Sequence, residues 1–213
     1  MTKRIKHKKL LEQVDKYYTQ KIMEDGATYK GVDWNSEESQ NLRFDQLLKV
    51  TGDERDCYVL DYGCGYGAMA LYMRERGFKG QYFGFDISEA MVKKAREQQS
   101  KLLNCTFETD MASLGVVDYT IASGIFNVKQ GVSDVEWRTY ILDTIRSLSE
   151  HSQKGFAFNM LTSYSDKDRM RPDLYYGDPK FFFDHCVRKY SRNVALHHCD
   201  YGIYEFSVLV RKG

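Results

Sequence analysis

Three glycines that alternate with other residues mark the stretch of this sequence with the clearest chemistry. The run VLDYGCGYGAMALYM places Gly63, Gly65 and Gly67 after an apolar segment and before a helical pattern. Glycine lets a backbone approach a ligand where a Cβ would block it, and the following helix turns its positive N-terminal end toward the loop. The stretch predicts a cradle for either the pyrophosphate of a dinucleotide or the amino-acid end of S-adenosylmethionine (SAM).

The glycines alone do not choose between these two ligands. The letters GCGYGA satisfy the dinucleotide pattern G-x-G-x-x-G/A if Ala68 takes the last position, and such a match is weak by itself. Asp86, which ends the next apolar run, suits the ribose diol of either ligand. Asp61 separates the two, because a carboxylate repels a pyrophosphate and attracts a cationic ammonium group.

Two further features favour SAM. The letters FETD end the third predicted strand with Asp110, where a polar acceptor can meet the exocyclic amine of an adenine. The chain closes with two strands around a turn at 200–202, in the region where a dinucleotide enzyme would continue its second nucleotide-binding half.

The glycine loop belongs to a region in which strands and helices alternate, and this alternation predicts a parallel sheet covered on both faces. Strands are expected over 57–62, 81–87, 104–109, 117–123 and 155–161, and helices over 66–76, 89–101, 133–150 and 179–190. The last two strands, within 193–212, are joined too tightly for a parallel crossover and must therefore be antiparallel.

Two helices are expected ahead of the sheet, over 8–23 and 36–50, with Ser36 and Ser39 as capping groups of the second. The polar segment between them contains a large aromatic residue, Trp34, which is typical of a loop that folds over a ligand. We expect a single domain over 1–213, in which residues 1–50 form a helical lid and residues 57–211 form the core.

The spacing D-x-G-x-G-x-G, followed by acidic residues at the next two strand ends, resembles the class I SAM-dependent methyltransferases. LDYGCGYG, FGFDIS and TFETDM correspond to the first three motifs of that family. The resemblance covers about residues 57–211 and implies an α/β fold. In this fold a Rossmann-like, doubly wound sheet of seven strands has the order 3-2-1-4-5-7-6, with strand 7 antiparallel, and N-terminal helices are added.

The resemblance also implies where the methionine half of SAM binds. It places Asp61, Gly63 and Gly65 around the methionine end, while Gly67 either joins them or only allows close packing of helix and strand. Ser123, where the fourth strand ends in ASGIFNVK, lies among residues that flank the reactive methyl group.

The nucleoside half of SAM is assigned by the same resemblance. Asp86 is expected on the ribose, and Ile87 against the adenine unless it is ordinary core. Asp110 and Met111 are expected near the adenine amine, with a helix or turn cap as the alternative for Asp110.

Two residues of the N-terminal segment are further candidates for the cofactor site. Trp34 would cover the sulfonium or the substrate through cation–π attraction, or else anchor the core. Arg43 would meet the SAM carboxylate. After methyl transfer the product S-adenosylhomocysteine (SAH) would occupy the same site.

The sequence says less about the molecule that accepts the methyl group than about SAM. ASGIFNVK lacks the N-P-P-Y turn of DNA adenine and glutamine methylases. Asn127 can hydrogen-bond a substrate but cannot act as a base. His198 is the first candidate base, ahead of His197 and His185, and a structural role is the alternative for this histidine. Tyr164 is a hydrogen-bonding or stacking group in the loop over 162–178. In the same loop Arg171 could meet a carboxylate or phosphate.

Composition and charge limit the ligands and partners that we expect for this chain. The net charge is only +1, and the five cysteines show no C-x-x-C pair and no zinc spacing, so free thiols in a reducing cytosol and no metal are expected. The basic run KRIKHKK favours a solvated turn over a nucleic-acid or membrane arm. We therefore expect a soluble, cytoplasmic enzyme acting on a small polar metabolite, such as a sugar derivative. An RNA methyltransferase and a non-catalytic SAM-binding protein are the alternatives, and the sequence does not choose between monomer and homodimer.

Overall fold

The computed structural model describes residues 7–198 and 204–213. Cys199, the turn expected at 200–202 and residues 3–6 of the basic run lie outside the described residues. Within the described ranges, no helix is both long enough and apolar enough to span a lipid bilayer.

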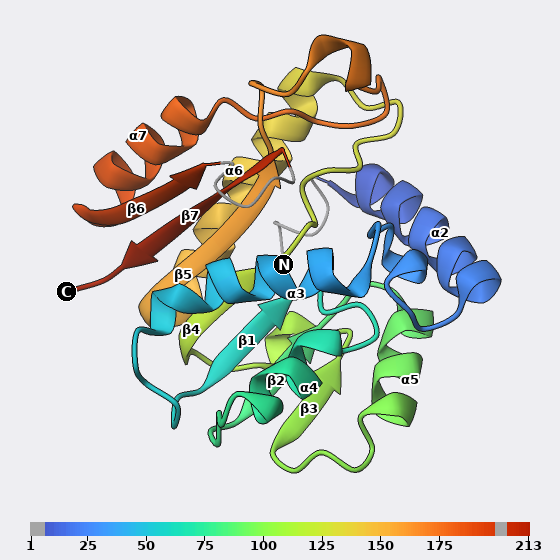
Figure 1. Cartoon of the computed structure of the whole chain (residues 1–213), viewed down its shortest axis with the longest axis vertical. Coiled ribbons are helices and arrows are strands. Elements are labelled where there is room, and N and C mark those ends of the chain that lie inside the picture. Colours follow the sequence, from blue (N-terminus) through green and yellow to red (C-terminus); the bar gives the residue numbers. More distant parts are fainter. Residues whose placement is uncertain (1–6, 199–203) are drawn as a thin grey trace.

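One mixed sheet forms the centre of the molecule (Figure 1), and its strand order is β3-β2-β1-β4-β5-β7-β6. Strand β7 runs antiparallel to both of its neighbours. These findings confirm the predicted fold class. The strands are β1 (Val59–Tyr62), β2 (Tyr82–Phe85), β3 (Cys105–Glu108), β4 (Val117–Ala122), β5 (Ser152–Leu161), β6 (Asn193–His198) and β7 (Glu205–Arg211).

Four of the helices, α3, α5, α6 and α7, begin at a side-chain capping group, whereas α2 and α4 have no side-chain cap among the described residues. Ser36, Ser88, Ser133 and Asp178 each accept a hydrogen bond from a backbone N–H of the first helical turn, and Ser36 and Ser39 form a reciprocal capping box. The helices are α2 (Lys8–Asp25), α3 (Glu37–Leu48), α4 (Ala68–Glu75), α5 (Glu89–Gln98), α6 (Asp134–Glu150) and α7 (Pro179–Lys189). Short 3₁₀ turns are η1 (Lys30–Val32), η2 (Lys49–Thr51), η3 (Met111–Ser113) and η4 (Lys167–Arg169).

Most elements end within two or three residues of their predicted bounds. Strand β5 begins three residues earlier than expected, at Ser152, which pairs with Val117 across a register shift between Val117 and Tyr119. Periodicity along one chain does not report such an irregular pairing, because the partner strand decides where the ladder starts.

Helices cover both faces of the sheet, with α3 and α4 in front and α6 behind in the view of Figure 1. Side chains of α3, α4 and α5 share one core cluster with inward residues such as Val59 and Ala157. Side chains of α6 and α7 share another with Phe156 and Phe158. Because neighbouring residues of β5 enter different clusters, the strand alternation expected for a two-faced sheet is present.

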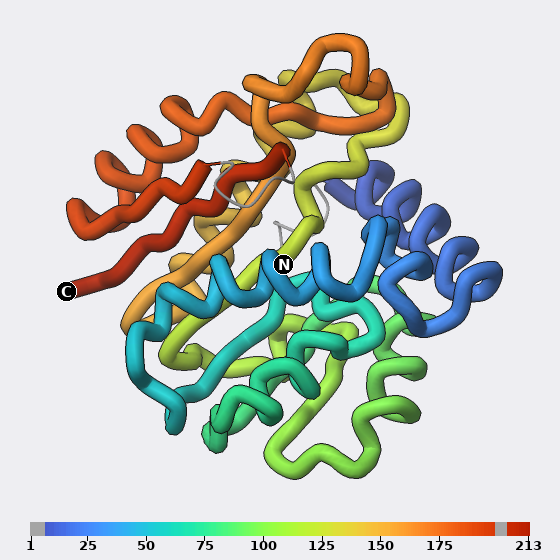
Figure 2. The backbone as a smooth tube through the Cα atoms, in the orientation of Figure 1, coloured from blue at the N-terminus to red at the C-terminus, as the bar shows by residue number. Residues whose placement is uncertain are grey.

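Helix α2 is tied to elements from both helical layers. Its Leu10 belongs to the cluster of α6 and α7, and His7, just before it, lies 2.9 Å from Asp143 of α6. Near its other end, the hydroxyls of Thr19 and Ser88 are 2.8 Å apart, and Ser88 caps α5. The tube of Figure 2 shows α2 next to the segments that follow β4 and β5. The helix therefore contributes side chains to the edge of the sheet where the parallel strands end.

Candidate active site

The glycine loop has a backbone that only glycine adopts easily. Gly63, Gly65 and Gly67 all have positive φ, at 83°, 54° and 79°. A Cβ on Gly63 would lie 2.3 Å from Cγ2 of Ile125. The N–H groups of Gly63 and Cys64 both donate to the carbonyl of Phe85, at 2.7 and 2.9 Å. The loop is thus folded back onto the end of β2, with no room for side chains at its tightest point.

Asp86 fixes this loop against the start of α5. One carboxylate oxygen accepts from the N–H of Gly65 and the other from the N–H of Ser88, both at 2.9 Å. Burial raises the pKa of Asp86 to about 6, and these two backbone hydrogen bonds oppose the rise. Two consecutive strand ends are therefore joined through one carboxylate.

Asp61 is the most unusual carboxylate of the site. It is 3% exposed, and its Oδ2 accepts a hydrogen bond from the Tyr82 hydroxyl at 2.7 Å. Its Oδ1 is buried and has no hydrogen-bond partner among the described residues. Burial raises the pKa of Asp61 to about 7, the Tyr82 hydrogen bond lowers it, and nearby Asp86 raises it further. A buried carboxylate oxygen without a donor is costly and is suited to a cationic or N–H ligand group.

A narrow cavity of about 100 Å³ lies over this loop and is named here the glycine-loop pocket. Among its lining are several residues expected from the sequence, namely Trp34, Asp61, Gly63, Gly65, Asp86, Ile87 and Ser123. The Ser123 hydroxyl oxygen is a second buried polar atom without a partner among the described residues. Other lining groups had not been expected from the sequence, among them Val14, Asp15 and Tyr18 of α2 and Tyr140 of α6.

Four residues expected at the cofactor are not in the lining of the glycine-loop pocket: Gly67, Asp110 and Met111, described next, and Arg43, described below. A Cβ on Gly67 would lie 2.7 Å from the Phe107 ring, which matches the close-packing alternative. Asp110 is exposed, and its Oδ1 accepts from the N–H of Ala112 at 3.2 Å, as the capping alternative expects. Met111 packs against the small cluster around Leu60. Contacts of Asp110 and Met111 with adenine remain predictions.

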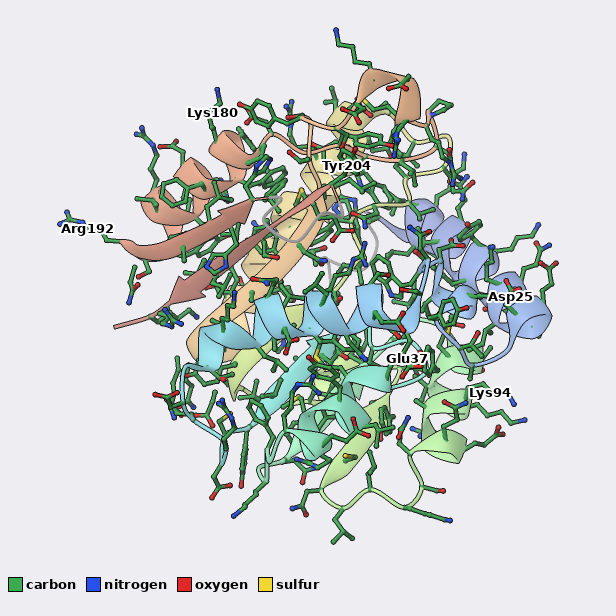
Figure 3. All side chains as sticks on the ribbon, in the orientation of Figure 1. Asp25, Glu37, Lys94, Lys180, Arg192 and Tyr204 are labelled. Carbon is green, nitrogen blue, oxygen red and sulfur yellow. The ribbon has the colours of Figure 1, made fainter. Side chains whose placement is uncertain are left out.

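A wider cavity of about 530 Å³, named here the outer cleft, lies beside the first. The two cavities share Tyr18, Val32, Trp34 and Gly124 as lining residues. The outer cleft is lined by residues of α2, of the segments after β4 and β5, and of the start of β7. Tyr204, the lining residue just before β7, is labelled in Figure 3. Its size lies within the range of ordinary small-molecule sites.

The charged groups of the outer cleft are largely paired. Lys21 Nζ lies 3.0 Å from Asp33 Oδ1, and the Tyr17 hydroxyl donates to Asp33 Oδ2 at 2.5 Å. Asp33 itself has a φ of 60°, which is uncommon for a residue other than glycine. Arg171 makes two hydrogen bonds to Asp173, with Nε–Oδ1 at 3.1 Å. Most cations here therefore already have a carboxylate beside them.

Arg43 and Asn127 are both buried and both bind Glu205, a residue that sequence analysis missed. Arg43 Nε and Nη2 donate to the Glu205 carboxylate at 2.9 to 3.1 Å. Asn127 Nδ2 donates to the same group at 3.3 Å, and its Oδ1 accepts from the N–H of Leu161 at 3.0 Å. All three residues line the outer cleft, and Arg43 is absent from the lining of the glycine-loop pocket. A single glutamate inside the apolar run YEFSVLV was the available signal for Glu205.

His198 and Tyr164 line neither the glycine-loop pocket nor the outer cleft. His198 Nε2 lies 2.8 Å from the Thr162 hydroxyl, and the Tyr164 ring meets the His198 ring edge-on at 5.4 Å. Tyr164 is 60% exposed. Both side chains therefore lie near the C-terminal ends of β5 and β6, outside the two cavities, and they are not part of the proposed site.

Comparisons with known proteins identify the family. A family described as a methyltransferase domain matches residues 53–128, which contain the glycine loop, Asp86 and Asp110. A Mycobacterium tuberculosis protein named as a methyltransferase is 49% identical over 154 residues, which cover 72% of this chain and 92% of that protein. The chain belongs to the class I SAM-dependent methyltransferases.

Solved structures of low sequence identity share the methyltransferase fold. The complex of DhpI with SAH aligns with a TM-score of 0.63 at 15% identity and covers 96% of this chain and 97% of that one. Magnesium protoporphyrin IX methyltransferase from Synechocystis, solved with bound SAM, aligns with a TM-score of 0.59 at 17% identity, over 83% and 81% of the two chains. This methyltransferase thus has the family's seven-stranded sheet. Because the chain belongs to the SAM-dependent methyltransferases, its cofactor is SAM.

Proposed function

We propose that this methyltransferase transfers the methyl group of SAM to an oxygen or nitrogen of a small polar metabolite, with sugar derivatives as the first class to test. The observation that carries the proposal is the arrangement of two cavities with a common wall. The narrow glycine-loop pocket contains buried polar atoms that have no partner within residues 7–198 and 204–213, whereas the outer cleft is wide and polar.

The glycine-loop pocket is proposed as the SAM site. Asp61 Oδ1 would accept from the SAM ammonium group, since it is buried and lacks a partner among the described residues. The loop at Gly63 and Gly65 would lie against the methionine moiety. Asp86 would accept from the ribose hydroxyls while it keeps its two backbone hydrogen bonds, because an ionised carboxylate has about four acceptor positions. Ile87 would pack against the adenine.

Bound SAM supplies an activated methyl group, so the main tasks of the chain are alignment and the exclusion of water. Trp34 and Gly124 contribute to both cavities and would therefore lie beside the path between cofactor and acceptor. Ser123, next to Gly124, offers a buried hydroxyl on the cofactor side.

The outer cleft is proposed as the acceptor site. Lys21, Arg43 and Arg171 of its lining each lie within 4.0 Å of a carboxylate. Charge that is already compensated favours a neutral, hydroxyl-bearing acceptor over a polyanion, because a phosphate-rich ligand would have to compete with these ion pairs. The tyrosine hydroxyls and the Trp34 ring add hydrogen-bonding and stacking groups suited to a sugar-like molecule.

Calorimetric titration with SAH tests the first half of the proposal, with NAD as the comparison ligand. Methyl-labelled SAM is then incubated with the enzyme and a cell extract separated into small molecules, RNA and protein. We expect SAH to bind, NAD not to bind, and label to enter the small-molecule fraction. Label confined to RNA or protein, or no label in any fraction, would contradict the proposed acceptor class.

A further inference from the structure

We infer that the buried Arg43–Glu205 ion pair is a positioning device, which holds Trp34 against Gly124 as the wall between the glycine-loop pocket and the outer cleft. The inference rests on the proposed assignment of these cavities to cofactor and acceptor. It assigns roles to Glu205 and Asn159, and it gives Arg43 a role other than contact with the SAM carboxylate.

The first step is the contact between Trp34 and its two neighbours. The Arg43 guanidinium carbon lies 3.9 Å from the centroid of the Trp34 ring, a cation–π arrangement. The indole also meets Gly124 so closely that a Cβ there would lie 2.3 Å from ring atoms Cζ2 and Cη2. Gly124 also has a positive φ of 74°. The ring is therefore in close contact with both a guanidinium group and a glycine backbone.

The second step is the hydrogen-bonded path that joins these two neighbours. Arg43 Nη2 donates to Glu205 at 2.9 Å, Asn159 Nδ2 donates to Glu205 at 2.7 Å, and the Gly124 N–H donates to Asn159 Oδ1 at 2.7 Å. Together with Trp34, the path forms a closed ring that links α3, β7, β5 and the turn after β4. Displacement of one member would therefore disturb the position of the indole.

The third step concerns the burial of this path. Glu205 and Asn159 are 0% exposed and Arg43 is 5% exposed. Buried ion pairs contribute little net stability, since the attraction between the charges is offset by their desolvation, whereas a fixed geometry is their better-attested use. Here that geometry fixes the residue that lines both cavities.

Fluorescence quenching of Trp34 tests the inference without any acceptor. The chain has two tryptophans, and Trp137 is 0% exposed, so iodide quenching reports Trp34. Three variants weaken the ring of contacts: Glu205→Gln, the double variant Arg43→Met/Glu205→Gln, and Gly124→Ala. The double variant removes both charges and guards against misfolding caused by one unpaired buried charge. We expect the quenching constant to rise at least about twofold in each folded variant.

Matched variants separate positioning from general destabilisation. Thr120→Val removes a different buried hydrogen bond, from the Thr120 hydroxyl to the Leu148 carbonyl at 2.8 Å, and should leave Trp34 quenching unchanged. Arg43→Lys keeps a positive charge near Glu205 but lacks the planar group over the indole. It should be thermally more stable than a single Arg43→Met variant, which removes the cationic group beside Glu205, while Trp34 quenching stays raised in both.

Kinetics with labelled SAM and the small-molecule fraction give the functional readout. The methyl-transfer rate at saturating SAM should fall about 10- to 100-fold in Glu205→Gln, as expected for a misplaced reacting group, while the SAH dissociation constant stays within about threefold. Unchanged Trp34 quenching in the folded variants would overturn the inference, and so would an equal loss in SAH affinity and in rate. A wild-type enzyme that transfers no label contradicts the proposed function instead, and the quenching result still decides the position of Trp34.

Discussion

The glycine-loop pocket and the outer cleft differ in how their polar groups are satisfied. In the pocket, Asp61 Oδ1 and Ser123 Oγ are buried without a partner among the described residues. In the cleft, the buried carboxylate of Glu205 accepts from Arg43, Asn127 and Asn159. The glycine-loop pocket therefore has polar atoms available to bind a ligand. In the outer cleft, many of the polar groups instead bind one another and hold the cleft in shape.

This difference agrees with the roles proposed for the two cavities. A buried polar group without a hydrogen-bond partner costs desolvation free energy, and a ligand with complementary groups offsets this cost. Such a pocket therefore suits one defined cofactor. A cleft whose charges are already paired recognises its ligand through shape, aromatic surface and hydroxyl contacts. The following predictions test the contrast, from the largest expected effect to the smallest.

The largest effect is expected for Asp86→Ala. The substitution removes a carboxylate that holds Gly65 and Ser88 and is assigned to the ribose, and hydrogen bonds to charged groups contribute about 1.5–3 kcal/mol each. SAH affinity, measured by calorimetry, should fall about 100-fold or more. Asp110→Ala, at the next strand end, separates the two expectations for Asp110. A residue that only caps a turn, as its exposure and its hydrogen bond from Ala112 favour, should change SAH affinity less than about threefold, whereas a larger loss would support the predicted adenine contact. Equal losses of SAH affinity in both variants would contradict the assignment of Asp86 as the main carboxylate for the ribose.

Gly63→Ala should destabilise the loop itself. The new Cβ would lie 2.3 Å from Ile125, at a φ of 83° that costs about 1–3 kcal/mol for other residues. Thermal unfolding should shift down by several degrees, since about 1 kcal/mol corresponds to roughly 2–4 °C in a chain of this size. Gly115→Ala, which meets nothing within 4 Å, is the control and should leave the unfolding temperature nearly unchanged. An unaltered melting curve for Gly63→Ala would show that the loop tolerates a side chain.

The pH dependence of SAH binding tests the unpaired oxygen of Asp61. Burial raises the pKa of Asp61 from 3.8 to about 7, so between these values the folded apo protein holds a proton that the unfolded chain has released. Apo stability should therefore fall as pH rises from about 4 to 7. Binding of an ammonium group favours the ionised carboxylate, so SAH affinity should rise about tenfold between pH 6 and 8.

Asp61→Asn provides the control for this pH dependence. The amide oxygen can still accept from Tyr82, while the titrating group is gone. We expect weaker SAH binding, a slope reduced to the smaller contribution of Asp86, whose pKa is raised to about 6, and a higher apo unfolding temperature above pH 7. A pH slope that persists in full in Asp61→Asn would assign the titration to another group.

The smallest effects are expected for His198→Gln and Tyr164→Phe. Both residues lie outside the two cavities, and Tyr164 is 60% exposed. SAH affinity and the labelled-methyl transfer rate should each stay within about twofold of the wild-type values. A rate loss of tenfold or more in His198→Gln, with SAH binding intact, would restore His198 as a candidate base. The acceptor would then have to bind closer to the C-terminal ends of β5 and β6.

Several parts of the pocket could be predicted because they are local in the sequence. Asp61, Gly63 and Gly65 lie within five residues at the end of one strand. Asp86 and Ser88 follow the next strand, and Ser88 caps the next helix. In a parallel sheet, consecutive strand ends meet at the same edge, so a short pattern already implies a shared site. The strand order and the antiparallel β7 were predicted through the same resemblance and are confirmed.

The partners of Arg43 could not be predicted in the same way. Its guanidinium was expected at the SAM carboxylate, and it binds Glu205, 162 positions later in the chain. Tyr18 of α2, which lines both cavities, had no signal beyond helical spacing. An arginine near a predicted site is compatible with many acceptors, and only packing decides which one it reaches.

The sequence by itself thus determined the family, the sheet and the conformation of the loop that we propose as the cofactor site, because those features depend on backbone conformations and caps set by neighbouring residues. The tertiary structure decided which buried polar atoms have no partner in the described part of the chain, as at Asp61 Oδ1, and which groups satisfy each other, as at Arg43 and Glu205. The physical reason is that hydrogen-bond satisfaction in a buried site depends on side chains brought together from distant segments, and no spacing along the chain encodes those distances.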